Sequence, residues 1–169
     1  MKNTPETQTL DAIAVDQLLP HPQNPRRSDV GAVSASIEAN GFYGAVLAQR
    51  STRRIIAGHG RWQAARDLGA TTVPVIWLDV DDERALRILL ADNRTTDLAV
   101  WDESELTELL RSLSENGDGL DGTAFSPDAL EKLLAAASPP DDFTAVDENL
   151  ETEHRCPRCG YEWSGSPTP

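Results

Sequence analysis

A short glycine-rich segment carries the chemistry that is easiest to read in this sequence. Residues 55–57 are apolar, Gly58-His59-Gly60-Arg61 follow, and helical spacing of apolar residues begins directly afterwards. A buried strand that turns into a helix points the unpaired first N–H groups of the helix at whatever lies above the turn, and glycines let a bulky anion approach the backbone. Arg61 adds a fork of donors suited to phosphate oxygens. The segment predicts an anion-binding turn; the alternative is a tight strand-to-helix turn without a ligand.

Two further groups could act on a bound phosphate. At a positive helix terminus His59 is expected to be neutral, as a general base or as a hydrogen-bond donor to phosphate. The alternative is a turn histidine that bonds a backbone carbonyl. Asp92 and Asn93 are expected at the end of a helix, where the carboxylate could hold Mg²⁺ through water. The alternative there is an ordinary helix C-terminal turn.

Hydrophobic periodicity and turn residues predict the elements that would position these groups. Ser28 is the expected N-cap of the first helix, and Pro74 suggests that its strand enters the sheet at an edge. Asp102 and Ser126-Pro127 are expected to open two later helices. The predicted strands cover residues 10–15, 45–49, 54–57 and 73–78, and the predicted helices cover 28–39, 60–68, 79–93, 103–115 and 128–137.

The order of these features resembles the N-terminal domain of the ParB/sulfiredoxin superfamily over residues 10–100. The features are Asn24-Pro25-Arg26, a helix, a strand pair into Gly58-His59-Gly60-Arg61, a strand, and a helix into Asp92-Asn93. The resemblance implies an α/β (α+β) fold, a small mixed sheet with flanking helices. It also implies a triphosphate site with Mg²⁺. Together with the anion-binding turn, the resemblance gives Asn24, Arg26, Gly58, Gly60, Arg61 and Asn93 as the expected binding residues, and His59 and Asp92 as the expected catalytic residues.

The segment also departs from the patterns of that superfamily. In partition proteins the corresponding box resembles Gly-Glu-Arg-Arg-x-Arg-Ala, so His59 stands for the Glu and Gly60 for the first Arg. Gly44-Ala45 replaces a Gln-Pro, which puts selection of cytosine in question. Sulfiredoxins carry a catalytic Cys where His59 lies, so repair of sulfinic acids is not expected.

The net charge of −13 is concentrated in the second part of the chain. Residues 1–100 hold 11 basic and 12 acidic side chains, whereas residues 101–169 hold 4 and 16. Acidic helices repel phosphates, so direct DNA binding by this chain alone is not expected, and residues 101–138 are expected to pack on the domain or on a protein partner. Residues 98–103 and 125–130 resemble the stretch that follows this domain in ParB-like proteins of phages and in those attached to DNA methyltransferases.

Cys156-Pro157-Arg158-Cys159-Gly160 resembles one zinc knuckle. A closed site needs four ligands, so zinc would require His154 and a remote group, or the same knuckle from a second chain. The alternative is two free thiols.

The organisation expected from composition is a polar N-terminus (1–9), the ParB/sulfiredoxin-like domain (10–100), an acidic helical extension (101–138), an acidic linker (139–153) and the cysteine-bearing tail (154–169). The longest apolar runs are far shorter than the roughly 20 residues of a membrane span. The first ten residues do not resemble a secretion signal, so a cytoplasmic location without membrane contact is expected.

The expected function is nucleoside triphosphate binding in a DNA-associated process, with Mg²⁺-dependent hydrolysis or phosphoryl transfer left open. Two alternatives are a metal-dependent DNA nuclease and a non-catalytic adaptor for a DNA-modifying partner. A homodimer is compatible with each of them.

Overall fold

The structure is a computed structural model, and it describes residues 8–137 and 154–163. The chain divides into two compact units, Met1–Ala137 and Ser138–Pro169. The predicted α/β domain and its helical extension therefore fall in one unit. Within the described residues, none of the helices is long and apolar enough to cross a bilayer.

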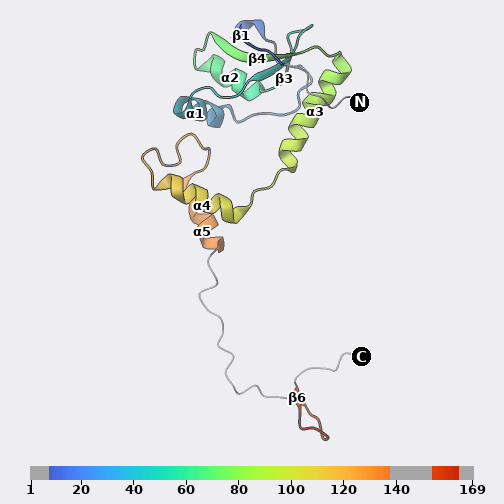
Figure 1. The fold of residues 1–169 in the computed structure, drawn as a ribbon, viewed down its shortest axis with the longest axis vertical. Helices are drawn as coiled ribbons and strands as arrows, with labels where there is room; N and C mark the ends of the chain where they lie inside the picture. Colours follow the sequence, from blue (N-terminus) through green and yellow to red (C-terminus); the bar gives the residue numbers. More distant parts are fainter. Residues whose placement is uncertain (1–7, 138–153, 164–169) are drawn as a thin grey trace. The chain divides into compact units, whose positions relative to one another are not determined.

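The first unit is built on a four-stranded mixed sheet, as expected (Figure 1). Its strands are β1 (Leu10–Ala14), β2 (Val46–Gln49), β3 (Ile55–Ala57) and β4 (Thr72–Leu78), in the order β1-β4-β2-β3. β4 runs antiparallel to β1 and parallel to β2, and β2 pairs antiparallel with β3. A short 3-10 turn, Val15–Gln17, follows β1.

The prediction that Pro74 marks an edge strand was wrong, because β4 lies between β1 and β2. The register explains how a central strand accommodates this proline. Pro74 lies opposite Ala12 of β1, whereas pairing with β2 begins only at Val75, opposite Val46. Before Val75 the strand has a neighbour on one side only, so the missing N–H of Pro74 removes no bond to β2.

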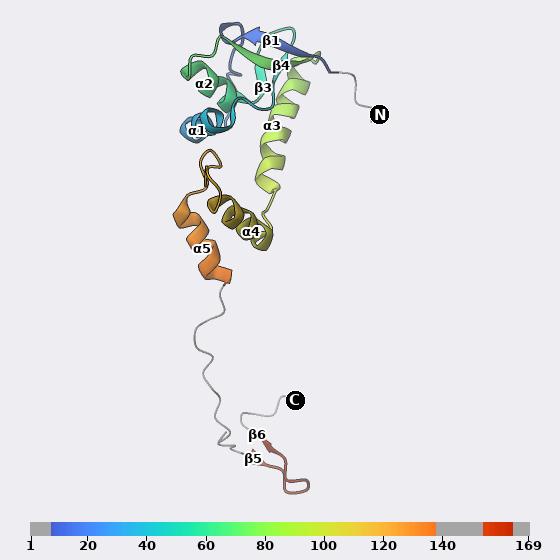
Figure 2. The ribbon, with the colours of Figure 1, turned by 60° about the vertical axis from the view of Figure 1, so that its left-hand side comes forward.

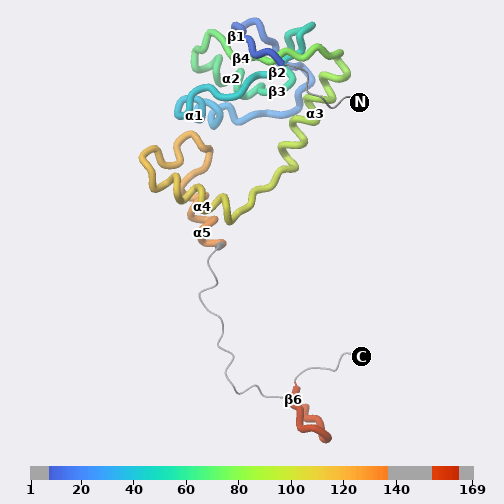
Figure 3. The backbone as a smooth tube through the Cα atoms, viewed as in Figure 1, coloured from blue at the N-terminus to red at the C-terminus, as the bar shows by residue number. Residues whose placement is uncertain are grey.

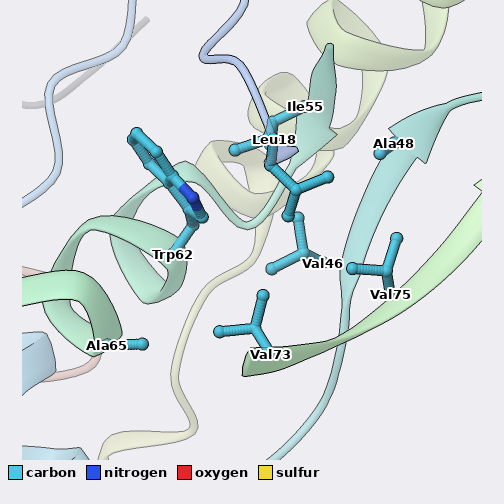
Figure 4. Close-up of a cluster of buried hydrophobic side chains, with 8 residues drawn as sticks. All are labelled: Leu18, Val46, Ala48, Ile55, Trp62, Ala65, Val73 and Val75. Atoms are coloured by element: carbon cyan, nitrogen blue, oxygen red, sulfur yellow. The ribbon is translucent and has the colours of Figure 1, made fainter. Parts of the chain in front are cut away.

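Helices cover both faces of the sheet. α2 (His59–Asp67) packs on one face, with α1 (Val30–Asn40) beside it, and α3 (Asp82–Leu98) packs against β3. Successive residues of β3 point to opposite faces, so Ile55 joins the cluster beneath α2 and Ile56 the cluster beneath α3. Figure 4 shows the first cluster, in which Trp62 of α2 faces the sheet. The Trp62 indole N–H also donates to Val15 O (2.9 Å), which fixes α2 on the sheet.

Two helix boundaries differ from the prediction. α1 is capped by Asp29, whose Oδ1 accepts the Ala32 N–H at 2.9 Å, and not by Ser28. α3 continues to Leu98, beyond the predicted end at Asn93. The hydroxyls of Thr95 and Thr96 donate to carbonyls of the preceding turn, so these residues satisfy their side chains without leaving the helix.

The helical extension consists of α4 (Glu103–Ser114) and α5 (Pro127–Ala137), which pack on each other around Leu106, Leu110 and Leu130. Asp102 and Ser126 cap these helices as predicted, by accepting the N–H groups of Glu105 (3.0 Å) and Ala129 (3.2 Å). The loop between the two helices reaches the end of α1 (Figure 2), where Asn40 Nδ2 donates to Gly122 O at 3.4 Å.

The described part of the second unit is a small hairpin of β5 (His154–Arg155) and β6 (Glu162–Trp163). The two strands are antiparallel, with His154 opposite Trp163 and Arg155 opposite Glu162. Cys156 and Cys159 lie in the turn between them.

Candidate functional site

The predicted strand-turn-helix is present at residues 55–61. β3 is fully buried, Gly58 takes the left-handed conformation (φ 87°, ψ 22°), and α2 begins at His59. A Cβ at Gly58 would add a contact of 3.4 Å to Ala45 O in a backbone conformation that other residues rarely adopt. The first bond of the helix runs from the Trp62 N–H to Gly58 O (3.0 Å), so the N–H groups of residues 59–61 have no partner within the helix.

A cavity of about 450 Å³ lies over this turn. It brings together all the residues that the sequence predicted for phosphate binding and catalysis, although they come from three separate stretches of the chain. Ser28 and Thr96 also line it and were not predicted. The full lining is Asn24, Arg26, Ser28, Val33, Leu47, Ala57, Gly58, His59, Gly60, Arg61, Asp92, Asn93 and Thr96.

The two unpredicted polar residues could have been found from a more accurate placement of the helices. Ser28 is free to line the cavity because Asp29 takes the capping role. Thr96 lies one turn beyond Asp92, and its hydroxyl donates to Asp92 O at 2.9 Å. A helix that continues past Asn93 places residues 92, 93 and 96 on one face.

Arg61 lies along one wall of the cavity. Its guanidinium donates to Ala45 O at 3.4 Å, and a Cβ at Gly44 would lie 3.4 Å from its Nη1. The glycine at position 44 therefore leaves room for the arginine to lie against the backbone. A guanidinium held by one long bond keeps further N–H groups available to an anion in the cavity.

Arg26 and Asn24 connect the opposite wall to α3. Arg26 Nη1 donates to Asp97 Oδ1 (2.6 Å) and to Asn93 O (3.1 Å), and Asn93 Nδ2 donates to Asn24 Oδ1 (3.4 Å). The segment between β1 and α1 consequently passes beside α3 (Figure 3). The cavity is closed on this side by contacts between segments that lie about seventy positions apart in the chain.

His59 is held in a defined protonation state. Its Nε2 accepts the backbone N–H of His21 at 3.2 Å, so the proton of the neutral ring belongs on Nδ1. Burial, and in second place the neighbouring His21, lower the pKa of His59 to about 4. Of the two roles considered for this residue, the geometry favours hydrogen-bond donation from Nδ1, because the Nε2 lone pair is already engaged. The alternative was a turn histidine that bonds a backbone carbonyl. His59 Nε2 does not make such a bond, because it accepts the backbone N–H of His21.

Asp92 and Asn93 lie within α3 rather than at its end, which corrects their predicted setting. Of the described residues that line the cavity, Asp92 is the one carboxylate, and Arg26 and Arg61 are the two guanidinium groups. Mg²⁺ in phosphate sites is commonly held by one or two carboxylates together with the phosphates themselves. One carboxylate facing two arginines and a row of free amides therefore fits a metal–phosphate ligand.

The predicted zinc ligand set of His154, Cys156 and Cys159 does not assemble within one chain. The His154 ring instead packs against Trp163, with ring centroids 5.5 Å apart. Among residues 8–137 and 154–163, no three His, Cys, Asp or Glu side chains form a group that could hold a metal ion.

Comparison with known proteins decides the family. The ParB N-terminal domain family matches residues 1–94, more than half of the chain. The chain belongs to this family. The resemblance found in the sequence is therefore confirmed, and the matched ParB domain contains the turn at residues 58–61 and both Asp92 and Asn93.

Individual ParB proteins agree with this assignment. The probable plasmid-partitioning protein ParB of Deinococcus radiodurans is 36% identical over 100 residues, which are 55% of this chain and 34% of that protein. The chromosome-partitioning protein ParB of Caulobacter vibrioides is 32% identical over 100 residues, or 53% and 33%. The chain thus spans about one third of the length of the curated ParB relatives that it matches.

A solved structure supports the fold. The C-terminally truncated chromosome-partitioning protein ParB from Caulobacter crescentus, complexed with CTP-γ-S, superposes with a TM-score of 0.58 at 23% identity, covering 76% of this chain and 86% of that one. At this identity the likeness establishes a shared ParB-type architecture.

Proposed function

We propose that this chain binds a nucleoside triphosphate together with Mg²⁺ in the cavity above residues 58–61, as part of a DNA-associated process. The observation that carries the proposal is the convergence, on one cavity, of free helix N-terminal amides, two arginines and one carboxylate. Each of these groups complements a different part of a metal-bound polyphosphate.

The phosphate chain would lie against the first turn of α2. The N–H groups of residues 59–61 point along the helix axis toward an anion. Gly58 makes the left-handed turn before them, and Gly60 leaves room for Ser28 of the cavity wall. Arg61 would contact the same oxygens from the side. His59 would donate from Nδ1, since its Nε2 already accepts the His21 N–H.

Asp92 and Asn93 would hold the metal ion from α3. A bound Mg²⁺ neutralises phosphate charge. Both bonds of Arg26, to Asp97 and to Asn93, are made by Nη1, so its Nη2 and Nε keep N–H groups that could reach a phosphate. Hydrolysis or phosphoryl transfer is a further step of the proposal. Phosphate release from CTP, ATP or GTP, measured for the wild type and for Asp92→Asn, would test it.

CTP is the first nucleotide to examine. The ParB from Caulobacter crescentus that shares the fold was solved with CTP-γ-S. The Arg61 side chain, however, lies against Gly44 and Ala45, where partition proteins resemble Gln-Pro. ATP and GTP therefore belong in the same experiment, because this difference puts selection of cytosine in question.

Isothermal titration of the full chain with CTP, ATP and GTP in the presence of Mg²⁺ tests the proposal. We expect at least one nucleotide to bind more tightly than millimolar, and Arg61→Ala to weaken it about 10- to 100-fold, the loss of one charge-assisted bond. Arg87→Ala is the matched control, since Arg87 is an exposed α3 arginine outside the cavity that pairs with Glu83. Millimolar or weaker binding of all three nucleotides, or equal affinities of the Arg61 variant and the wild type, would overturn the proposal.

A further inference from the structure

The hairpin at residues 154–163 holds its two cysteines in a closed turn. Cys156 is fixed on both sides by backbone bonds, because its N–H donates to Tyr161 O (2.7 Å) and its O accepts the Gly160 N–H (2.9 Å). Gly160 takes a φ of 77°, which turns the chain back toward β6. The strands of the hairpin thereby bring Cys156 and Cys159 to the same end.

Three groups donate hydrogen bonds to the sulfur of Cys156. The backbone N–H groups of Arg158 and Cys159 donate to it, and so does the Cys159 thiol. Backbone N–H groups that point at a cysteine sulfur fix the position of that sulfur. Donors held against the sulfur in a closed turn suit a cysteine that serves as a metal ligand.

The hairpin is also held by an ion pair between Arg155 and Glu162 (3.5 Å) and by aromatic contacts of Trp163. Its strands are two residues each, and Tyr161 is 69% exposed while stacking on Trp163. An isolated two-stranded hairpin is marginal in water, and segments of this size generally need a metal ion, a disulfide or a partner chain. Metal binding supplies folding free energy directly in such small modules.

We propose that Cys156 and Cys159 form half of a tetrathiolate zinc site, and that the same turn of a second copy of this chain supplies the other half. Structural zinc takes four ligands in a tetrahedron, and this turn offers two sulfurs on one side. The His154 ring packs against Trp163, and among the described residues no group of three possible ligands includes the two cysteines. A two-fold axis through the metal makes the two halves equivalent, as in most protein homodimers.

The charge and proton balance of the site are consistent with this arrangement. Zn²⁺ with four thiolates carries a net charge of −2, and the Arg158 between the cysteines adds one positive charge from each copy. Each cysteine gives up its thiol proton, so the assembly of one site releases four protons and forms four Zn–S bonds. Binding therefore weakens as the pH falls.

Metal content and mass of the full chain, purified without a histidine tag and kept reduced, test the proposal. After removal of metal by a chelator, added Zn²⁺ is expected to bind at about 0.5 ion per chain and to double the mass seen by light scattering. Chelator should reverse both. Co²⁺ in place of Zn²⁺ should give the intense absorption of a tetrahedral cobalt thiolate.

Three variants distinguish the ligands. Cys156→Ser and Cys159→Ser are each expected to lose the zinc-dependent doubling, whereas His154→Gln should keep both stoichiometry and doubling. Circular dichroism of the cysteine variants should match the wild type, because the helices lie in the other unit. The experiment is carried out without nucleotide, so its result is independent of the triphosphate proposal.

Several results would overturn the zinc proposal. One ion per chain in a monomer would mean that other groups of the same chain complete the site. A zinc-dependent dimer that persists in Cys156→Ser would place the contact elsewhere. Absence of Zn²⁺ binding by the reduced chain would leave the cysteines as a free dithiol.

Discussion

An imidazole occupies the position where the partition proteins' box carries a glutamate. Beside the phosphates of the proposed ligand a carboxylate would add negative charge, whereas the His59 ring is neutral with a pKa of about 4. The bond from the His21 N–H also ties the residue to the segment that precedes α1. His59 therefore connects the turn at residues 58–61 to the loop that carries Asn24 and Arg26.

The lowered pKa of His59, caused chiefly by burial, predicts a pH dependence of stability. Because the pKa of His59 is about 4 in the folded chain against an ordinary 6.5, the unfolded state binds more protons between these values. We expect the unfolding midpoint to fall as the pH drops from 6.5 to 4, and this contribution to level off below 4. His59→Gln should show a shallower fall in thermal unfolding followed by circular dichroism. His21, whose pKa is also lowered, accounts for part of the slope that remains. Identical pH profiles of the wild type and the variant would contradict the assignment.

Gly60 predicts a sharper effect on the ligand site. A Cβ at this position would lie 2.8 Å from both Cβ and Oγ of Ser28, so Gly60→Ala must displace the cavity wall. Gly31 is the matched control, since it is likewise the second residue of its helix and a Cβ there would meet Asp29 at 3.4 Å. We expect Gly60→Ala to reduce nucleotide affinity at least fivefold in titration and Gly31→Ala to leave it unchanged. Equal affinities of the two variants would show that the Ser28 contact is unimportant.

At the scale of elements, the sequence correctly predicted features that depend on residues close together in the chain. The turn after β3 and the caps at Asp102 and Ser126 follow from residue types within four positions of each other. The end of α3 was not predicted correctly, because Asp92-Asn93 resembles a helix end by composition. What continues the helix includes threonine hydroxyls that bond backward, together with a long-range ion pair between Arg26 and Asp97.

The central position of β4 could not be predicted for a related reason. A proline excludes a strand from the middle of a sheet only if both neighbours extend past it. Here β2 begins opposite Val75 and so leaves Pro74 with β1 alone. Such staggering depends on the lengths of strands far away in the sequence. The residues of the candidate site could be named from the sequence because the family resemblance related segments that spacing alone could not, and the structure places these residues around one cavity.

The cap of α4 gives a prediction for the extension. Asp102 Oδ1 accepts the N–H groups of Ser104 (3.1 Å) and Glu105 (3.0 Å). Asp102→Ala should lower the free energy of unfolding by about 1 kcal/mol in urea titration, the usual contribution of an N-cap. Glu108→Ala is the control, because Glu108 is exposed in the middle of the same helix and caps nothing. It removes the same charge and should change the free energy of unfolding by less than about 0.5 kcal/mol. If Glu108→Ala lowered the free energy of unfolding as much as Asp102→Ala does, the effect would come from the lost charge and not from the lost cap.

At the scale of the whole molecule, the net charge is −13, whereas surfaces that bind nucleic acids are usually basic. Residues 1–100 are nearly neutral, with 11 basic and 12 acidic side chains, and residues 101–169 carry 4 basic and 16 acidic ones. A small anion within the cavity is governed by the nearby arginines, because charges beyond roughly 10 Å are screened at ordinary ionic strength. A DNA duplex is larger than that distance and meets the field of the acidic helices as well.

This contrast predicts an unusual salt dependence. Proteins that bind DNA through basic surfaces bind more tightly as salt is lowered, because the counterions that they release from the DNA gain more entropy in a more dilute salt solution. For the full chain we expect no saturable binding to a fluorescent duplex at about 0.15 M salt, and none at about 0.02 M, where repulsion acts over a longer distance. Fluorescence anisotropy with and without CTP and Mg²⁺ measures this, and nicking of a plasmid under the same conditions tests the nuclease alternative. Micromolar binding that weakens steeply with added salt would mean that the basic residues of the first hundred positions outweigh the net charge.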